Sequence, residues 1–373
     1  MTTQTQPDKM QDDRVPVTVL TGFLGSGKTT LLNNLLTPSF WEARQQPSPL
    51  TAVIMNEFGS IGIDHQLIAE NQGPLTLLNG GCVCCEIQGT LLPTLKNLWM
   101  GRSDGAVSRY DRIVIETTGV ADPTSIMETL LHSNWIARRH YLDGIVTMVD
   151  AVFGNQQLDE NFEAVRQVVM ADRLLLTKVD LADDATVAQL KARLHQLNPA
   201  ATIVPVLQGE VDPAHVYTLR AYQQFQATET KQWLAADQFR ALTPMTSQPH
   251  TGIRSPSSKA SSGVDGRIRS FSATFEEPVA WQGVTDALAA LNFSCGAQLL
   301  RMKGIINVQG SSDRPVVLHG VQHLFYPPIK LANWPDEDHR SRFVFITAEL
   351  DETFIAKLLE AFTQAIRNAS KDK

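Results

Sequence analysis

The eight-residue stretch GFLGSGKT (22–29) constrains the fold of this chain more than any other feature. It fits the pattern G-x-x-x-x-G-K-[ST], whose glycines let backbone N–H groups curl around phosphate oxygens. An apolar run at 15–20 precedes it, and a helix-length pattern at 28–36 follows it. A glycine-rich turn that arose by chance would lack this strand–loop–helix context. The chain is therefore predicted to hold a nucleoside phosphate at the end of a buried strand.

Each residue type in this phosphate loop has an expected role. Lys28 is expected to reach the β- and γ-phosphates, and the Thr29 hydroxyl is expected to ligate Mg²⁺. The positive end of the helix that begins at Lys28 adds to the attraction for phosphate. The residues expected to line the nucleotide phosphates are Gly22, Gly25, Ser26, Gly27, Lys28, Thr29 and Thr30.

Short apolar runs alternate with helix-length segments from residue 15 to about residue 207. Most of these runs are apolar on both alternating faces, as expected for strands that helices cover on two sides. The alternation predicts an α/β fold with a doubly wound, mostly parallel sheet, as in P-loop NTPases. The expected strands are 15–20, 51–55, 75–78, 112–116, 145–149, 173–177 and 203–207, and expected helices include 28–36, 123–131 and 185–197.

Residues 243–269 differ in composition from the rest, because Ser, Pro and Gly are frequent there and few residues are apolar. We predict that this segment is a flexible linker. It would separate a nucleotide-binding domain at 15–242, preceded by a polar tail at 1–14, from a smaller α+β domain at 270–373. In the smaller domain, strands are expected at 271–276, 304–310, 314–320 and 342–350, and helices at 279–291 and 351–366.

Overall composition narrows the class of protein. A length of 373 residues suggests two domains, and a hydrophobic content of 43% excludes a chain that is disordered throughout. The net charge of −7 argues against a protein that neutralises nucleic-acid phosphates. No apolar run approaches the ~18–20 residues that span a bilayer, and the polar N-terminus lacks the apolar stretch of a signal peptide. We expect a cytoplasmic protein without a membrane or nucleic-acid partner.

A second stretch, RIVIETTG (112–119), fits a nucleoside triphosphatase. It ends a buried strand with Glu116 and continues to Gly119. A carboxylate at that point can hold Mg²⁺ through water, and the glycine can follow the γ-phosphate. Glutamate at a strand end is often only a solvated rim residue. Its combination with the phosphate loop nevertheless favours a catalytic role for Lys28, Thr29 and Glu116.

A third stretch, TKVD (177–180), is similar to the N-K-x-D sequence with which GTPases read the base. Asp180 would accept hydrogen bonds from guanine N1 and N2, which adenine cannot offer, and the Lys178 stem would cover the ring. Thr177 stands where asparagine is usual, and this removes one side-chain amide. We therefore expect GTP rather than ATP, bound through Thr177, Lys178 and Asp180.

Three of the four cysteines lie within GGCVCC (80–85). Disulfides between adjacent cysteines are strained, so Cys82, Cys84 and Cys85 cannot readily pair with one another. Thiolates are soft ligands that favour Zn²⁺ or Cu(I) over Mg²⁺. Three sulfurs leave one tetrahedral position for Glu57, a water or an incoming protein, and such an incomplete site suits a metal that must leave again. Redox-active or simply buried thiols are the alternatives.

These stretches together resemble the CobW-type P-loop GTPases, a family of metallochaperones that includes the zinc-regulated GTPase metalloprotein activators. The resemblance implies a P-loop GTPase domain followed by a CobW C-terminal domain, a C-x-C-C zinc motif at Cys82, Cys84 and Cys85, and GTP or GDP with Mg²⁺ as ligands. The cobalamin branch of the family handles cobalt. The segments that carry the resemblance are GFLGSGKTT, NEFGSIGID, GGCVCC, IETTGVADP, TKVD, LLRMKG, HGVQH and RFVFITAELD.

The expected mechanism is a switch in which GTP sets the geometry of the cysteine site and hydrolysis releases zinc to a client metalloenzyme. No residue stands out as the one that orients the attacking water, so slow intrinsic turnover is expected. The alternatives are a cobalt-handling protein of cobalamin synthesis, a nucleotide-regulated zinc-binding protein that transfers nothing, and a small-molecule kinase. TKVD and the absence of an evident acceptor site count against the kinase. Either a monomer or a dimer is compatible with the sequence.

Overall fold

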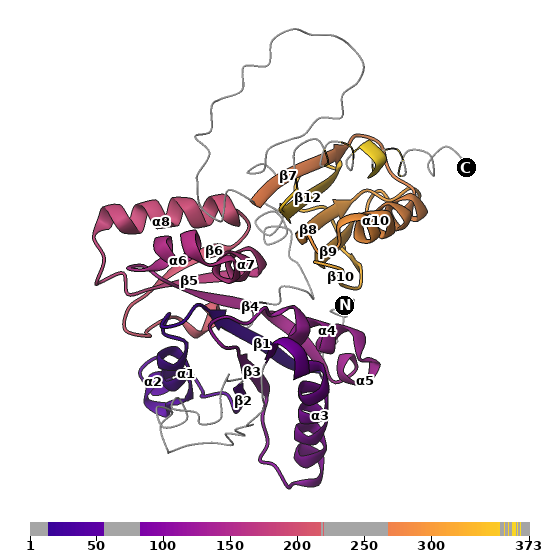
Figure 1. Cartoon of the computed structure of the whole chain (residues 1–373). Coiled ribbons are helices and arrows are strands. Elements are labelled where there is room, and N and C mark those ends of the chain that lie inside the picture. Colours follow the sequence, from indigo (N-terminus) through magenta and orange to yellow (C-terminus); the bar gives the residue numbers. More distant parts are fainter. Residues whose placement is uncertain are drawn as a thin grey trace, which may run out of the picture.

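The computed structural model describes residues 14–55, 83–217, 219 and 268–350, together with single residues between 354 and 366. For residues 83–90 it describes the backbone alone. The described chain forms two separate sheets (Figure 1). The expected strand at 75–78 lies outside the described residues, as do the predicted tail except Arg14 and the predicted linker except Ile268 and Arg269, which begin a strand.

The first sheet has six strands, each parallel to its neighbours, in the order β2-β3-β1-β4-β5-β6. The predicted doubly wound, parallel α/β fold is confirmed. Strand β4 is longer than its apolar centre predicted, because it extends backward along β1. The strands are β1 (Val15–Gly22), β2 (Thr51–Met55), β3 (Arg112–Glu116), β4 (His140–Asp150), β5 (Arg173–Thr177) and β6 (Thr202–Val206).

Helices cover both faces of this sheet, as the two-sided apolar strands require. Along β5, Leu174 and Leu176 point into one buried cluster with α7 and α8, whereas Leu175 points into another with α1. The helices are α1 (Lys28–Leu36), α2 (Pro38–Glu42), α3 (Val83–Asp104), α4 (Thr124–His132), α5 (Asn134–Ala137), α6 (Gly154–Glu160), α7 (Phe162–Met170) and α8 (Asp184–Leu197), and a short 3₁₀ turn follows at Pro213–His215.

Helix α3 is an element that the sequence pattern does not predict. Pro93 lies inside it and removes a backbone donor, which weakens the helical pattern. In the structure, Leu91, Leu95 and Leu98 pack into the same buried cluster as the apolar residues of α4. Tertiary packing therefore outweighs the local cost of the proline.

The second sheet is antiparallel, in the order β10-β9-β8-β12-β7, and β11 pairs with β9. Helix α10 (Trp281–Cys295) covers one face of it together with Phe362 and Ile366, which are both buried. The strands are β7 (Ile268–Phe275), β8 (Leu299–Ile306), β9 (Val316–Val321), β10 (Leu324–Phe325), β11 (Ile329–Lys330) and β12 (Ser341–Ala348).

Strand β8 corrects the expectation of a strand at 304–310, since it begins five residues earlier, at Leu299, and ends at Ile306. Arg301 and Lys303 are charged, and charged residues are rarely buried, so this segment does not look like a strand interior. Both side chains are nevertheless almost completely buried. They lie on the face of the sheet opposite α10, where the first domain covers them.

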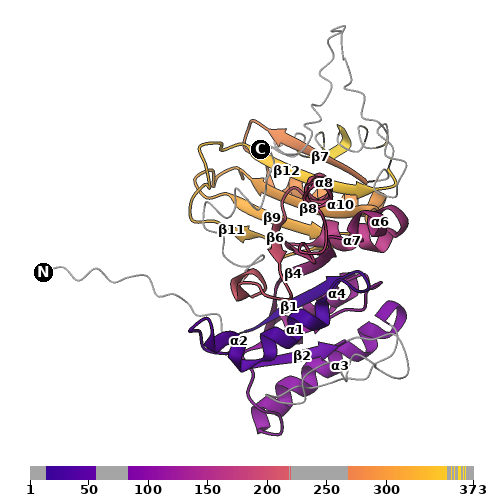
Figure 2. The same ribbon diagram turned by 90° about the vertical axis from the view of Figure 1, so that its left-hand side faces the viewer.

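The apolar contact between the two domains is made largely by α7, which lies beside β8 (Figures 1 and 2). Val165 and Val168 of α7 belong to one buried cluster with Ile305 of β8 and with Val344 and Ile346 of β12. The first domain therefore supplies the second cover of the antiparallel sheet.

A buried arginine lies at the centre of this contact. Arg301 donates hydrogen bonds to the carbonyl oxygens of Val169 (3.2 Å) and Ala171 (2.6 Å), and it also contacts the Asp172 carboxylate. These carbonyls are at the end of α7, where helical partners are missing. Burial and the neighbouring Arg301 hold the pKa of Lys303 well below its ordinary value. The interface thus buries an amino group whose charged form is disfavoured by its surroundings.

Candidate nucleotide site

The phosphate loop connects β1 to α1 through backbone conformations that favour glycine. Gly22 has φ 141°, and a Cβ atom there would lie 2.4 Å from the Met148 carbonyl oxygen. Gly25 and Gly27 also have positive φ, 73° and 94°. The Ser26 N–H donates to the Phe23 carbonyl oxygen (3.2 Å), which closes the loop. The three predicted glycines are therefore positions where a side chain would strain or block the backbone.

Lys28 and Thr29 begin α1 and face the ends of β1 and β3. Lys28 is 9% exposed, and its Nζ donates to the carbonyl oxygens of Gly22 (2.7 Å) and Phe23 (3.2 Å). The Thr29 hydroxyl donates a long hydrogen bond to Glu116 Oε1 (3.4 Å). Thr30, also expected near the phosphates, is exposed on α1. The sequence separates Thr29 from Glu116 by more than eighty residues, and the parallel pairing of β1 with β3 brings them together.

The segment after Glu116 runs along the phosphate loop. A Cβ atom at Gly119 would lie 2.6 Å from the Leu24 backbone nitrogen, so a glycine is required for this approach. The buried Thr117 hydroxyl donates to the Thr21 hydroxyl (2.7 Å) and ties the start of the segment to β1. Gly119 therefore lies directly beside the phosphate loop. That it follows a γ-phosphate stays a prediction.

The TKVD stretch ends β5 at the same edge of the sheet. The Thr177 hydroxyl donates to the Ser26 carbonyl oxygen (2.9 Å), which belongs to the phosphate loop. Lys178 has φ 55°, and its Nζ donates to Asp150 Oδ2 (2.6 Å). Asp180 is exposed in the turn that follows. The phosphate loop and the candidate base-binding stretch are therefore in direct contact.

Asp150 is a site residue that the sequence analysis missed. It ends β4, is 1% exposed, and accepts hydrogen bonds from Val152 N–H (2.8 Å) and Phe153 N–H (3.2 Å) through its second oxygen. A signal was present, since an aspartate follows the apolar run 145–149 and ligands in parallel α/β sheets bind beyond the carboxyl ends of strands. Asp150 thus ends its strand in the same way as Glu116 ends β3.

The cysteine motif is described only in part. Cys84 and Cys85 lie in the first turn of α3, while Cys82 and Glu57 are outside the described residues. Among the described residues, no group of three or more His, Cys, Asp and Glu side chains is placed to hold a metal ion. Cys295 is a buried free cysteine in α10. The predicted zinc ligands Cys82, Cys84, Cys85 and Glu57 thus stay a prediction.

In the part of the chain that the structure describes, no helix combines the length and the apolar character needed to cross a membrane.

Two family models match the chain. The CobW/HypB/UreG nucleotide-binding domain matches residues 16–205, and the cobalamin synthesis protein cobW C-terminal domain matches residues 268–363. The first match contains the phosphate loop, Glu116, Asp150 and TKVD.

Similar proteins and a similar solved structure agree with these models. The zinc chaperone YjiA of Escherichia coli is 32% identical over 345 residues, which cover 91% of this chain and 95% of YjiA. The zinc-regulated GTPase metalloprotein activator 1 of Schizosaccharomyces pombe is 34% identical over 218 residues, 56% of this chain and 50% of that protein. The crystal structure of Zn(II)-bound YjiA GTPase from E. coli superposes with a TM-score of 0.66 at 28% identity, covering 94% of this chain and 99% of that one. The chain therefore belongs to the CobW/HypB/UreG family and carries a CobW C-terminal domain.

Proposed function

We propose that this protein is a GTP-hydrolysing metallochaperone that binds zinc at Cys82, Cys84 and Cys85 and passes it to a client metalloprotein. GTP binding and hydrolysis are supported by the hydrogen bonds at one edge of the parallel sheet, where Lys28, Thr29 and Glu116 lie next to TKVD. The zinc part is supported by the cysteine motif and by the names of the relatives, a zinc chaperone and a zinc-regulated GTPase.

The site residues have separate tasks in hydrolysis. Lys28 would exchange its two carbonyl acceptors for β- and γ-phosphate oxygens and offset their charge. The Thr29 hydroxyl and the Glu116 carboxylate offer hard oxygen donors side by side, which fits Mg²⁺. Bound Mg²⁺ would neutralise charge on the phosphates. The exposed Asp180 is free of the sheet and able to meet guanine N1 and N2.

A structural path supports nucleotide control of the zinc site. Helix α3 begins at Val83, inside the cysteine motif, and its Leu91 and Leu95 pack with Met127 of α4. Helix α4 begins at Thr124, and only Asp122 and Pro123 separate it from the segment 116–121 that lies along the phosphate loop. A change in that segment on hydrolysis would therefore reach the helix on which Cys84 and Cys85 lie.

Turnover tests the nucleotide part. Lys28→Ala should abolish GTP hydrolysis, because it removes the cation that faces the β- and γ-phosphates. Lys191→Ala, which changes an exposed lysine of α8, is the control and should hydrolyse GTP at the wild-type rate. Steady-state phosphate release with GTP and with ATP measures both, and equal use of ATP and GTP would contradict the guanine assignment.

Zinc competition tests the metal part. A chromophoric chelator should report tighter zinc binding with a non-hydrolysable GTP analogue than with GDP, and Cys84→Ser should weaken binding by orders of magnitude while nucleotide binding persists. Cys295→Ser, which changes the buried cysteine of α10, is the matched control. Identical zinc affinity in both nucleotide states would leave a zinc-binding GTPase without the switch. Zinc release to an apo-metalloenzyme only upon hydrolysis separates transfer from simple regulation.

A further inference from the structure

The side-chain amide of Gln167 joins α7 to the segment that follows Glu116. Its Nε2 donates to the carbonyl oxygens of Gly119 (3.1 Å) and Ala121 (3.1 Å), more than forty residues away in the chain. Both acceptors are carbonyl oxygens, so the NH₂ side of the amide has to face them. The Gln167 side chain is 1% exposed, so bulk solvent does not compete for these two hydrogen bonds.

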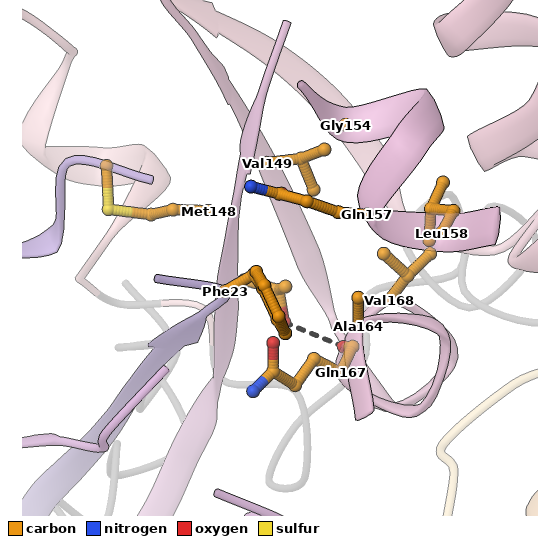
Figure 3. Close-up of a pocket in the computed structure, with 10 residues that line it drawn as sticks. Phe23, Met148, Val149, Gly154, Gln157, Leu158, Ala164, Gln167 and Val168 are labelled. Carbon is orange, nitrogen blue, oxygen red and sulfur yellow. Dashed lines mark hydrogen bonds between the residues drawn. The ribbon is translucent and has the colours of Figure 1, made fainter. Parts of the chain in front are cut away.

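Gln167 also lies beside the phosphate loop. Together with Phe23 of that loop it lines a small cavity of about 10 Å³, which has room for one water molecule (Figure 3). Leu24, the next loop residue, lies directly against Gly119, where a Cβ atom would be 2.6 Å from Leu24 Cγ. The backbone at Gly119 thus contacts both the phosphate loop and the Gln167 amide of α7.

We propose that Gln167 is a positioning residue for nucleotide hydrolysis, an inference that rests on the proposed GTPase function. The Gly119 carbonyl and the Val120 N–H belong to one planar peptide, so fixing the oxygen also fixes the direction of the N–H. Backbone N–H groups that are held in place before reaction are effective donors to phosphate oxygens. Gln167 acts on the γ-phosphate only through this backbone and does not touch the nucleotide.

A second buried amide, which donates to α7 from the residue that follows α8, provides a matched control. Asn198 is fully buried, and its Nδ2 donates to the carbonyl oxygens of Val168 (2.8 Å), Val169 (3.1 Å) and Ala171 (2.9 Å). It therefore caps the C-terminal end of α7. Loss of Gln167 removes this donor from the Gly119 and Ala121 carbonyl oxygens beside the phosphate loop. Loss of Asn198 removes a donor only at the end of α7, where Arg301 still donates to two of the same carbonyl oxygens.

The experiment compares Gln167→Met, Gln167→Glu and Asn198→Leu in the full chain. For each protein we measure kcat and KM for GTP, the affinities for GDP and for a non-hydrolysable GTP analogue, and Tm. Both Gln167 variants should lower kcat about tenfold or more, and they should weaken binding of the GTP analogue more than binding of GDP. Asn198→Leu should lower Tm while keeping kcat and the ratio of the two affinities. Gln167→Glu keeps the shape of the side chain and serves as the test if Gln167→Met does not fold.

Two outcomes would overturn the assignment. The first is that the Gln167 variants keep the wild-type kcat and the wild-type ratio of analogue affinity to GDP affinity. The second is that they bind the analogue and GDP equally weakly, in proportion to their loss of Tm, as variants of a purely structural residue would. Failure of the proposed function is distinguishable from both. If the wild-type chain hydrolyses no GTP, the GTPase proposal fails, whereas the ratio of triphosphate-analogue to diphosphate affinity still decides on Gln167 for whichever nucleotide the wild type binds.

Discussion

The Thr177 hydroxyl donates a 2.9 Å hydrogen bond to the carbonyl oxygen of Ser26, so a residue expected near the base also braces the phosphate loop. The same hydroxyl lies 3.2 Å from the Val149 carbonyl oxygen, at the end of the neighbouring strand. Both contacts are buried. A threonine is sufficient for this role because it needs one donor and a compact side chain rather than an amide.

We predict that Thr177→Val weakens GTP and GDP binding alike. The change keeps the side-chain shape but leaves the Ser26 carbonyl without this donor, and a lost buried hydrogen bond of about 1 kcal/mol corresponds to roughly fivefold in affinity. Thr177→Ser keeps the hydroxyl and should remain close to wild type. Titration with fluorescent nucleotides measures both, and tighter binding by Thr177→Val than by Thr177→Ser would refute the bracing role.

Guanine preference should depend on Asp180. Asp180→Ala removes the acceptor for guanine N1 and N2, so GTP should lose about tenfold or more of its advantage over ATP, while the affinity for ATP hardly changes. Asp184, exposed in the first turn of α8, provides the control through Asp184→Ala. Displacement of a fluorescent nucleotide by GTP and by ATP gives the ratio of the two affinities. An unchanged ratio in Asp180→Ala would place base recognition elsewhere.

Most of the candidate nucleotide site could be predicted from the sequence because its parts follow strands. Gly22, Glu116 and Thr177 each end an apolar run, and parallel strands bring their carboxyl ends to one edge. The fold class follows from the same alternation. Gln167 could not be predicted in this way, since it lies in the middle of a helix, where a glutamine normally indicates an exposed face.

The domain contact could not be predicted either. Burial of charged residues depends on partners that no local pattern contains, and Arg301 finds its partners in the backbone after Val168, 130 or more positions earlier in the chain. LLRMKG therefore looks half exposed in the sequence. The pattern predicts a strand that begins only at the apolar GIINV, five residues after the start of β8. The resemblance of LLRMKG to the CobW family indicates a C-terminal domain, but it does not indicate how that domain packs against the first.

Breaking the buried Arg301 contact should destabilise the protein strongly. Arg301→Met keeps the apolar stem but removes the guanidinium that contacts the Asp172 carboxylate, which is 6% exposed, and breaking a buried ion pair typically costs about 3–5 kcal/mol. Arg340, whose side chain is 46% exposed and pairs with Asp338, is the control, and Arg340→Met should cost less than about 1 kcal/mol. Urea unfolding measures both. Equal losses would mean that the domain contact contributes little to stability.

Stability should fall in mild acid because of His140. The pKa of His140 lies at about 4, below the ordinary 6.5, because burial disfavours the charged ring and Arg102 and Arg139 add positive charge nearby. Between these two values the unfolded chain binds a proton at this site and the folded chain does not. The unfolded state is therefore favoured as the pH falls, and the contribution of His140 is complete only above about pH 6.5.

His140→Phe tests this pH dependence, because it keeps an aromatic ring beside Trp99, with which the imidazole makes an edge contact, and removes the titrating group. At pH 5 the titration of His140 should cost the wild type about 2 kcal/mol relative to pH 7.5, and the variant should lack this loss. Burial also lowers the pKa of His319, so the variant keeps part of the acid sensitivity. His195→Gln, at an exposed position of α8, should follow the wild-type curve. Urea unfolding of the three proteins between pH 5 and 7.5 provides the measurement, and parallel curves for wild type and His140→Phe would show that His140 does not titrate as its burial requires.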